Sequence, residues 1–178
     1  MPTLFISDLH LDESRPRLIA AFEDFLAGVA RNTQALYVLG DLFESYIGDD
    51  DDVPLPARVA QALRTLRDTG VPIYFMHGNR DFLLGEDYAT RAGMTLLPDP
   101  TVIELNGERV LLMHGDTLCT DDVEYQKFRT LVRDPQWQQQ FLAKPLNERR
   151  AFAAQARGES RQHTLFHGLI FRADGQAG

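Results

Sequence analysis

Apolar runs of strand length alternate with amphipathic stretches over the first two thirds of this chain. The strand-like runs are residues 3–6, 35–39 and 71–76. Residues 16–31 and 55–68 repeat apolar side chains at helical spacing, and residues 85–92 are a shorter helical stretch that ends at Gly93. This alternation predicts the α/β class, with a largely parallel sheet flanked by helices.

The expected apolar stripe of the first helix consists of Leu18, Phe22, Leu26 and Val29. After residue 100 the pattern changes, because Asn106-Gly107 separates two apolar runs, which is the signature of a β-hairpin that makes the sheet mixed.

Helical patterns follow the hairpin to residue 157. Asp121 is expected to cap a helix over residues 122–133, and residues 136–157 read as further helix with a break at Pro145.

Four short polar motifs each follow an apolar run. Three of these runs are the predicted strands named above. The motifs are Asp8-Leu9-His10, Gly40-Asp41, Gly78-Asn79-Arg80-Asp81 and His114-Gly115-Asp116. In open α/β sheets, the loops at the carboxyl ends of the strands carry the binding site. The motifs supply five candidate metal ligands, which are Asp8, His10, Asp41, Asn79 and His114.

The ligand types indicate a pair of divalent cations. Asp8 and His10 are one residue apart, so in an extended segment they point to the same side, and the two oxygens of Asp41 can bridge two ions. Mixed oxygen and nitrogen ligands without thiolate favour manganese, iron or zinc. Two ions about 3.5–4 Å apart can clamp a phosphoryl group for in-line attack. The fork of Arg80 can then bind a phosphoryl oxygen.

Other acidic residues have simpler interpretations. Asp81 and Asp116 are expected to orient their neighbours rather than bind metal. Glu44 is expected at the surface or as a supporting residue, and residues 49–52 as a solvated loop that caps the next helix.

Composition indicates which partners and which cellular compartment to expect. The 178 residues carry a net charge of −8, which disfavours nucleic acid as the main partner. One cysteine excludes an internal disulfide, and Cys119 is expected to be small and partly buried. Neither a leader nor an apolar run of membrane-spanning length is evident, so we expect a cytoplasmic or peripheral membrane protein.

Longer blocks carry a resemblance to a known family. The motifs resemble those of the calcineurin-like metallophosphoesterases. The blocks Gly40-Asp41-Leu42-Phe43-Glu44, Ile47-Gly48-Asp49-Asp50, His77-Gly78-Asn79-Arg80-Asp81-Phe82-Leu83 and His114-Gly115-Asp116-Thr117-Leu118-Cys119-Thr120-Asp121 resemble the UDP-2,3-diacylglucosamine diphosphatases within that superfamily.

This resemblance implies a fold, an activity and a cofactor. The fold is a calcineurin-like α/β (α+β sandwich) architecture, with mixed sheets flanked by helices and a helical lid. The activity is hydrolysis of the pyrophosphate bond of UDP-2,3-diacylglucosamine to UMP and 2,3-diacylglucosamine 1-phosphate, in lipid A biosynthesis. Two Mn²⁺ ions serve as cofactors, and the enzyme works at the cytoplasmic face of the inner membrane.

Site residues carry over position by position. One ion is held by Asp8, His10 and Asp41, and the other by Asp41, Asn79 and His114. Asn79 and Arg80 are the implied catalytic residues. The implied substrate contacts are Asn79, Arg80, Asp122, Ser160 and Thr164. In the lid, apolar side chains would meet acyl chains or the bilayer and arginines would meet anionic headgroups; a lid packed on its own core is the alternative.

The sequence also departs from that family. The family has a later Gly-His-Thr-His motif that completes both metal shells, and this sequence lacks it. The ligand roles are not transferred to His163 or His167. We therefore expect a chain without the C-terminal strands, divided into a core (1–134), a lid segment (135–164) and a divergent tail (165–178), with weak or no activity. The alternatives are a general metallophosphoesterase acting on soluble nucleotides and an inactive truncated remnant.

Overall fold

A four-stranded parallel sheet forms the centre of the molecule. The computed structural model describes residues 1–158 of the chain. The strands are β1 (Thr3–Ile6), β2 (Ala35–Val38), β3 (Ile73–Met76) and β4 (Met94–Leu97), which pair in that order. Strand β4 was not predicted, since its four residues follow a helix directly and offer no alternation of their own. The predicted parallel sheet is confirmed.

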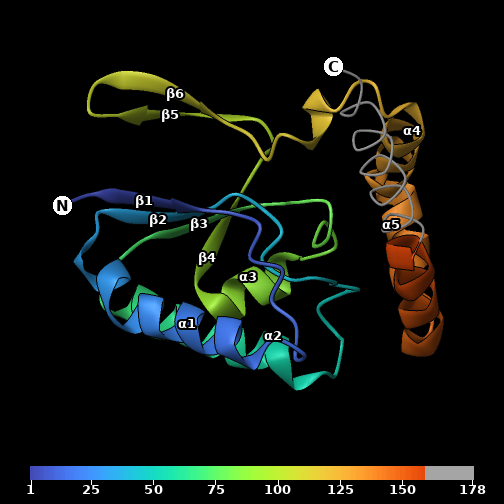
Figure 1. The fold of residues 1–178 in the computed structure, drawn as a ribbon, viewed down its shortest axis with the longest axis horizontal. Helices are drawn as coiled ribbons and strands as arrows, with labels where there is room; N and C mark the ends of the chain where they lie inside the picture. The colour runs from blue at the N-terminus through green and yellow to red at the C-terminus, as the bar shows by residue number, and fades with distance from the viewer. Residues whose placement is uncertain (159–178) are drawn as a thin grey trace, which may run out of the picture.

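Three helices cover one face of this sheet (Figure 1). They are α1 (Pro16–Ala27), α2 (Pro54–Asp68) and α3 (Glu86–Ala92). Their apolar stripes meet buried strand residues such as Leu36 and Phe75 in a single core. The predicted stripe of α1 is wrong at Val29, which is 65% exposed. The helix ends at Ala27, and Val29 belongs to a short 3-10 helix, η1 (Val29–Asn32).

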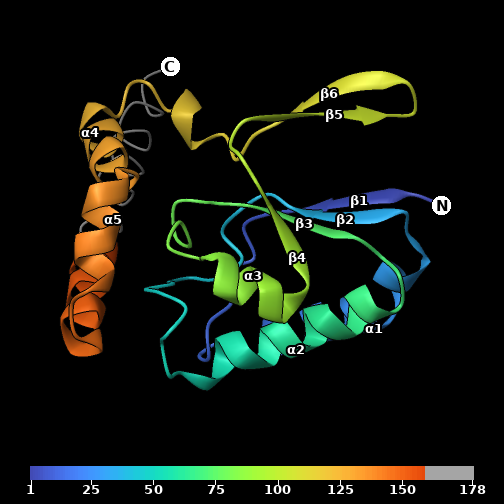
Figure 2. The same cartoon turned by 180° about the vertical axis from the view of Figure 1, so that it is seen from behind.

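The predicted hairpin is confirmed. Strands β5 (Thr101–Leu105) and β6 (Glu108–Leu112) are antiparallel. Asn106 and Gly107 both have positive φ, 54° and 86°, as a type I′ turn requires. The hairpin forms a two-stranded sheet of its own. It therefore does not extend the parallel sheet as we expected, and it lies on the opposite side of that sheet from α1 and α2 (Figure 2).

Residues 123–158 form a helical segment. A short 3-10 helix, η2 (Asp116–Leu118), leads from β6 to α4 (Val123–Val132) and α5 (Pro135–Leu142), and residues 146–158 are again helical after the predicted break at Pro145. Asp122, rather than Asp121, caps α4 by accepting a hydrogen bond from the Tyr125 amide. The segment stands opposite the carboxyl ends of β1, β2 and β3 (Figure 1). The site loops consequently lie between the sheet and this segment.

Candidate metal site

The loops after β1 and β2 run side by side and are joined by backbone hydrogen bonds. The amide of Asp8 donates to the carbonyl of Gly40 at 3.1 Å, and that of His10 donates to the carbonyl of Asp41 at 2.9 Å. Asp8, His10 and Asp41 all have positive φ, between 48° and 56°. Such backbone strain in non-glycine residues concentrates at functional sites. The proximity of Asp8 and His10 was predicted, but through an extended backbone, and that reason is wrong.

Two glycines allow the loops to approach each other without side chains between them. A Cβ on Gly40 would lie 2.6 Å from Gly78 Cα and 2.6 Å from His114 Nδ1. A Cβ on Gly78 would lie 2.1 Å from Asp41 Oδ1. Any larger residue at either glycine would separate the loops of the second, third and fourth motifs, which carry Asp41, Gly78 and His114. These two glycines therefore determine how closely the candidate ligands converge.

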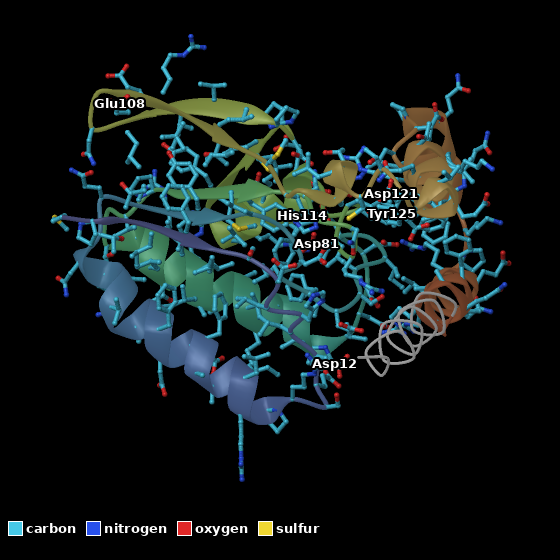
Figure 3. All side chains as sticks on the ribbon, turned by 45° about the horizontal axis from the view of Figure 1, so that its top comes forward. Asp12, Asp81, Glu108, His114, Asp121 and Tyr125 are labelled. Atoms are coloured by element: carbon cyan, nitrogen blue, oxygen red, sulfur yellow. The ribbon has the colours of Figure 1, made fainter. Side chains whose placement is uncertain are left out.

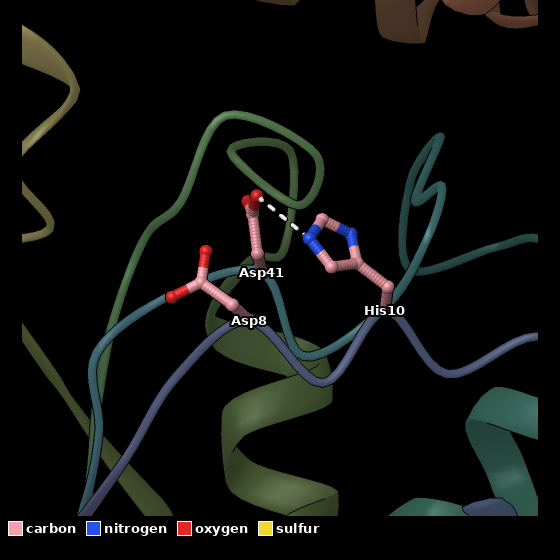
Figure 4. Close-up of side chains that lie close together, drawn as sticks. All are labelled: Asp8, His10 and Asp41. Carbon is pink, nitrogen blue, oxygen red and sulfur yellow. Dashed lines mark ion pairs between the residues drawn. The ribbon is translucent and has the colours of Figure 1, made fainter.

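Asp8, His10 and Asp41 form a cluster that could hold a cation (Figure 4). Each offers a ligand atom within 4.8 Å of the others, and His10 Nε2 is 3.7 Å from Asp41 Oδ2. On the far side of the ring, His10 Nδ1 lies 3.2 Å from Glu44 Oε2. A proton on Nδ1 facing that carboxylate leaves the lone pair of Nε2 directed at the cluster.

His114 approaches Asp41 from the third side. Its Nδ1 is 2.8 Å from the carbonyl oxygen of Leu39, and its Nε2 is 3.9 Å from Asp41 Oδ1. A carbonyl oxygen can only accept, so Nδ1 carries the proton and Nε2 keeps its lone pair. In Figure 3, His114 lies near Asp81, between the sheet and the helical segment. Both imidazoles are thus oriented as metal ligands are.

Asp41 itself is 2% exposed. Its Oδ1 accepts a hydrogen bond from the Arg80 amide at 2.9 Å. Burial raises the pKa of the Asp41 carboxyl group above its usual range. A bound cation would stabilise the ionised carboxylate, so this donor set fits a divalent ion.

Asp81 orients its neighbours, as predicted. The side chain is fully buried and accepts hydrogen bonds from the amides of Leu42 at 2.7 Å and Gly78 at 2.9 Å. Burial, followed by the charge of Asp41, raises the pKa of Asp81 to about 6. One carboxyl group thereby joins the second and third motif loops.

Asp116 also orients neighbours, as predicted, and connects the fourth motif to the helical segment. Its Oδ2 accepts hydrogen bonds from the Tyr125 hydroxyl at 2.7 Å and from Arg129 Nε at 2.8 Å. Burial alone would raise the pKa of Asp116, but these two donors hold it below its usual value. From the same helical segment, Arg133 donates to the carbonyl of Gly78 at 2.8 Å.

A cavity of about 980 Å³ opens between the motif loops and the helical segment. Its polar lining residues include Asp8, Asn79, Arg80, His114 and Asp122. Its aromatic lining residues include Phe82, which follows the third motif, and Phe128, Phe141 and Phe152 of the helical segment. The predicted contacts Ser160 and Thr164 lie outside the described residues, as do His163 and His167. One cavity is thus lined by candidate metal ligands and by aromatic side chains, and the space along the aromatic side chains of the helical segment is its apolar chamber.

The acidic loop at residues 49–52 differs from its prediction. The residue that precedes α2, Val53, makes no side-chain cap. Asp49 instead accepts hydrogen bonds from the amides of Gly85 and Tyr88, at the start of α3. The other three aspartates pair with Arg149 and Arg150 of the helical segment. These two arginines therefore pair with core carboxylates, and Arg149, at 2% exposure, is buried against the core.

Glu44 was expected at the surface or as a supporting residue, and the structure favours the second, since it lies beside the imidazole of His10. Sequence reasoning missed other residues of the site. Tyr125 and Arg133 were assigned no role, because their partners lie on loops whose positions only the fold reveals. Phe82 could have been found, since it directly follows the Gly78-Asn79-Arg80-Asp81 motif. Cys119 is exposed rather than partly buried.

Comparison with known proteins defines the class. The calcineurin-like phosphoesterase family matches residues 1–170, so the chain belongs to that family, whose members are metal-dependent hydrolases. The family implies divalent metal ions, consistent with the cluster around Asp41.

Curated relatives are more specific. The chain is 59% identical over 170 residues to a UDP-2,3-diacylglucosamine hydrolase of Stenotrophomonas maltophilia, covering 94% of this chain and 68% of that protein. Hydrolases of the same name from Cellvibrio japonicus and Escherichia fergusonii are 59% and 57% identical, covering 90% and 91% of this chain and 67% and 68% of their own lengths. The chain thus spans about two thirds of these relatives. None of the described helices has the length and apolar character needed to cross a bilayer.

Proposed function

We propose that this chain hydrolyses the pyrophosphate bond of UDP-2,3-diacylglucosamine, giving UMP and 2,3-diacylglucosamine 1-phosphate in lipid A biosynthesis. The observation that carries the proposal is the cavity, which is lined both by candidate metal ligands and by aromatic side chains. A substrate with a charged pyrophosphate and two acyl chains needs both surfaces. The name shared by relatives 57–59% identical to this chain supports the same substrate.

Five residues would hold two Mn²⁺ ions in this proposal. Asp8, His10 and Asp41 would hold one, and Asp41, Asn79 and His114 the other. The hydrogen bond that leaves His114 Nε2 free, the approach of Glu44 to His10 Nδ1 and the burial of Asp41 fit this assignment. Bound ions would supply Lewis-acid polarisation of the phosphoryl oxygens and lower the pKa of water.

The side chains of the chain itself would bind and orient the substrate. Arg80 lines the cavity beside the candidate ligands, and its guanidinium would bind a phosphoryl oxygen and stabilise charge in the transition state. Asn79 would present its amide oxygen to an ion and its amide nitrogen to the substrate. Asp122, which lines the cavity while capping α4, would contact the substrate, together with Ser160 and Thr164.

The division of the chain into core, lid and tail is part of the same proposal. Residues 1–134 would form the core, residues 135–164 the lid and residues 165–178 a divergent tail. The apolar lining contributed by Phe141 and Phe152 supports a lid that meets acyl chains. Because the substrate is a membrane lipid, the protein would act at the cytoplasmic face of the inner membrane as a peripheral protein.

The test is manganese-dependent release of UMP from UDP-2,3-diacylglucosamine, with Asn79→Ala as the control variant. Release by the wild type that is lost in the variant supports the proposal. A folded wild-type chain that releases no UMP overturns it. Equal rates on the deacylated UDP-sugar would instead favour a general metallophosphoesterase acting on soluble nucleotides.

A further inference from the structure

Arg149 lies in the helical segment and is almost completely buried, at 2% exposure. Its Nη1 donates to the carbonyl oxygen of Ile47 and to Asp50 Oδ1, each at 2.8 Å, and its Nη2 donates to Asp50 Oδ2. A charged side chain is rarely buried unless it is paired, and a fork bound by both carboxylate oxygens has a fixed geometry. This contact is therefore a specific connection between two parts of the chain 99 residues apart.

Gly48 provides the surface on which this connection rests. Its φ is +135°, and a Cβ there would lie 2.4 Å from Arg149 Nη1 and 2.9 Å from Leu142 Cδ2. The helical segment thus packs directly on bare backbone between β2 and α2. The Cβ position also lies 2.8 Å from Asp50 Oδ1, so the missing side chain of Gly48 leaves room for the Asp50–Arg149 pair itself.

The connection lies where the two walls of the cavity meet. On the core side, Ser45, Tyr46 and Ile47 line the cavity immediately before Gly48. On the other side, Phe141 and Phe152 line it from the helical segment. Asp8, His10, Asn79 and His114 lie on other loops, whereas Asp41 lies earlier on the same connection between β2 and α2. None of these five residues contacts Arg149 in the hydrogen bonds and ion pairs of the described residues. A change at the connection should thus alter the apolar chamber more than the metal centre.

We propose that the Asp50–Arg149 pair, seated on Gly48, is a positioning device that sets the width of the apolar chamber and so selects acylated nucleotide-sugars over short phosphodiesters. The selection rests on the proposed function, whereas the connection itself rests on geometry. Asp50 and Arg149 act through the residues that they hold and do not touch the substrate.

Two variants break the connection by different means. Asp50→Asn removes the charge that pairs with a buried guanidinium. Gly48→Ala puts a methyl group where Arg149 Nη1 and Leu142 Cδ2 now lie, so these side chains must shift, and it strains a backbone whose φ is +135°. Arg150→Gln is the matched control. Arg150 is the neighbouring residue, its side chain is 43% exposed, and among the described residues it pairs only with Asp51 and Asp52. Trp137, the single tryptophan of the sequence, stacks on Phe141 at 4.8 Å and reports the state of the helical segment.

Kinetics should separate the two substrates. For UDP-2,3-diacylglucosamine, Asp50→Asn and Gly48→Ala should raise KM about tenfold or more with little change in kcat. The reason is that the apolar chamber of the free variant is no longer held in shape, so substrate binding must also order it. Hydrolysis of bis(4-nitrophenyl) phosphate, a short phosphodiester, should be unchanged. Arg150→Gln should behave as the wild type with both substrates. Unchanged KM in both variants, or an equal loss on both substrates, would overturn the proposal.

Binding without turnover keeps this test separate from the proposed function. With a chelator present, titration of UDP-2,3-diacylglucosamine against Trp137 emission gives a Kd that requires no catalysis. A weaker Kd in both variants supports the positioning device even if the wild type releases no UMP, an outcome that would overturn the proposed function alone. A wild type that releases UMP, with variants of unchanged Kd, would overturn the positioning device alone.

Discussion

Gly78→Ala tests how closely the motif loops must approach. The added Cβ would lie 2.1 Å from Asp41 Oδ1 and 2.3 Å from the Asp41 amide nitrogen. Ordinary contacts of a Cβ begin at 3.4 Å, so Asp41 or Gly78 must move by about 1 Å. Gly78 is not among the residues with positive φ. Crowding rather than backbone strain therefore determines the outcome.

The displacement is large on the scale of metal coordination. Ligand distances in metal sites are held to about 0.2 Å, and Asp41 would serve both ions. Since even residues that only support a ligand are worth about 10–100-fold in affinity, we expect Gly78→Ala to weaken Mn²⁺ binding at least about 100-fold, or ~2.7 kcal/mol.

Isothermal titration calorimetry with Mn²⁺ measures this loss. The control is Gly70→Ala, where a Cβ meets nothing within 4 Å although φ is +99°. That variant should lose about 1 kcal/mol of stability through its strained backbone and keep wild-type metal affinity. Wild-type Mn²⁺ affinity in a folded Gly78→Ala protein would refute the reasoning.

Three further predictions follow from contacts in and near the site. Glu44→Gln should weaken Mn²⁺ binding about 10-fold in calorimetry, because the amide orients the His10 ring less well than the carboxylate does; unchanged affinity would contradict that role. Phe141→Ala, which removes a 4% exposed ring stacked on Trp137, should cost about 3 kcal/mol in urea unfolding, and a cost near zero would show that the ring is not packed in solution. Arg149 holds the pKa of Asp50 below its usual 3.8, so the pair contributes stability above that pH and loses it as the pH falls through the lower folded value. Arg150, Asp51 and Asp52 are the other charged groups nearby. Trp137 emission of the metal-free protein should consequently change only in acid, and an identical acid transition in Asp50→Asn would exclude this origin.

The sequence was sufficient to predict where the site lies. Parallel strands end at one edge of a sheet, so polar motifs at those ends had to converge, and the structure brings Asp8, His10 and Asp41 together. The hairpin was equally predictable, because Asn106-Gly107 has one strongly preferred turn.

Other features depend on contacts between distant parts of the chain. The acidic run at residues 49–52 is typical of a solvated loop, and only the fold brings Arg149 and Arg150 against it. The positive φ of His10 likewise accompanies a hydrogen bond from its amide to the carbonyl of Asp41, on a loop that only the fold brings alongside. Local patterns predict elements, whereas these pairings are selected by tertiary packing.

Electron paramagnetic resonance of the protein titrated with Mn²⁺ tests the central claim most directly. Because Asp41 is proposed to bridge both ions, two Mn²⁺ per chain should give an exchange-coupled spectrum. In His114→Ala the coupling should disappear, leaving one isolated ion held by Asp8, His10 and Asp41. A single uncoupled Mn²⁺ in the wild-type chain, or none, would contradict the account.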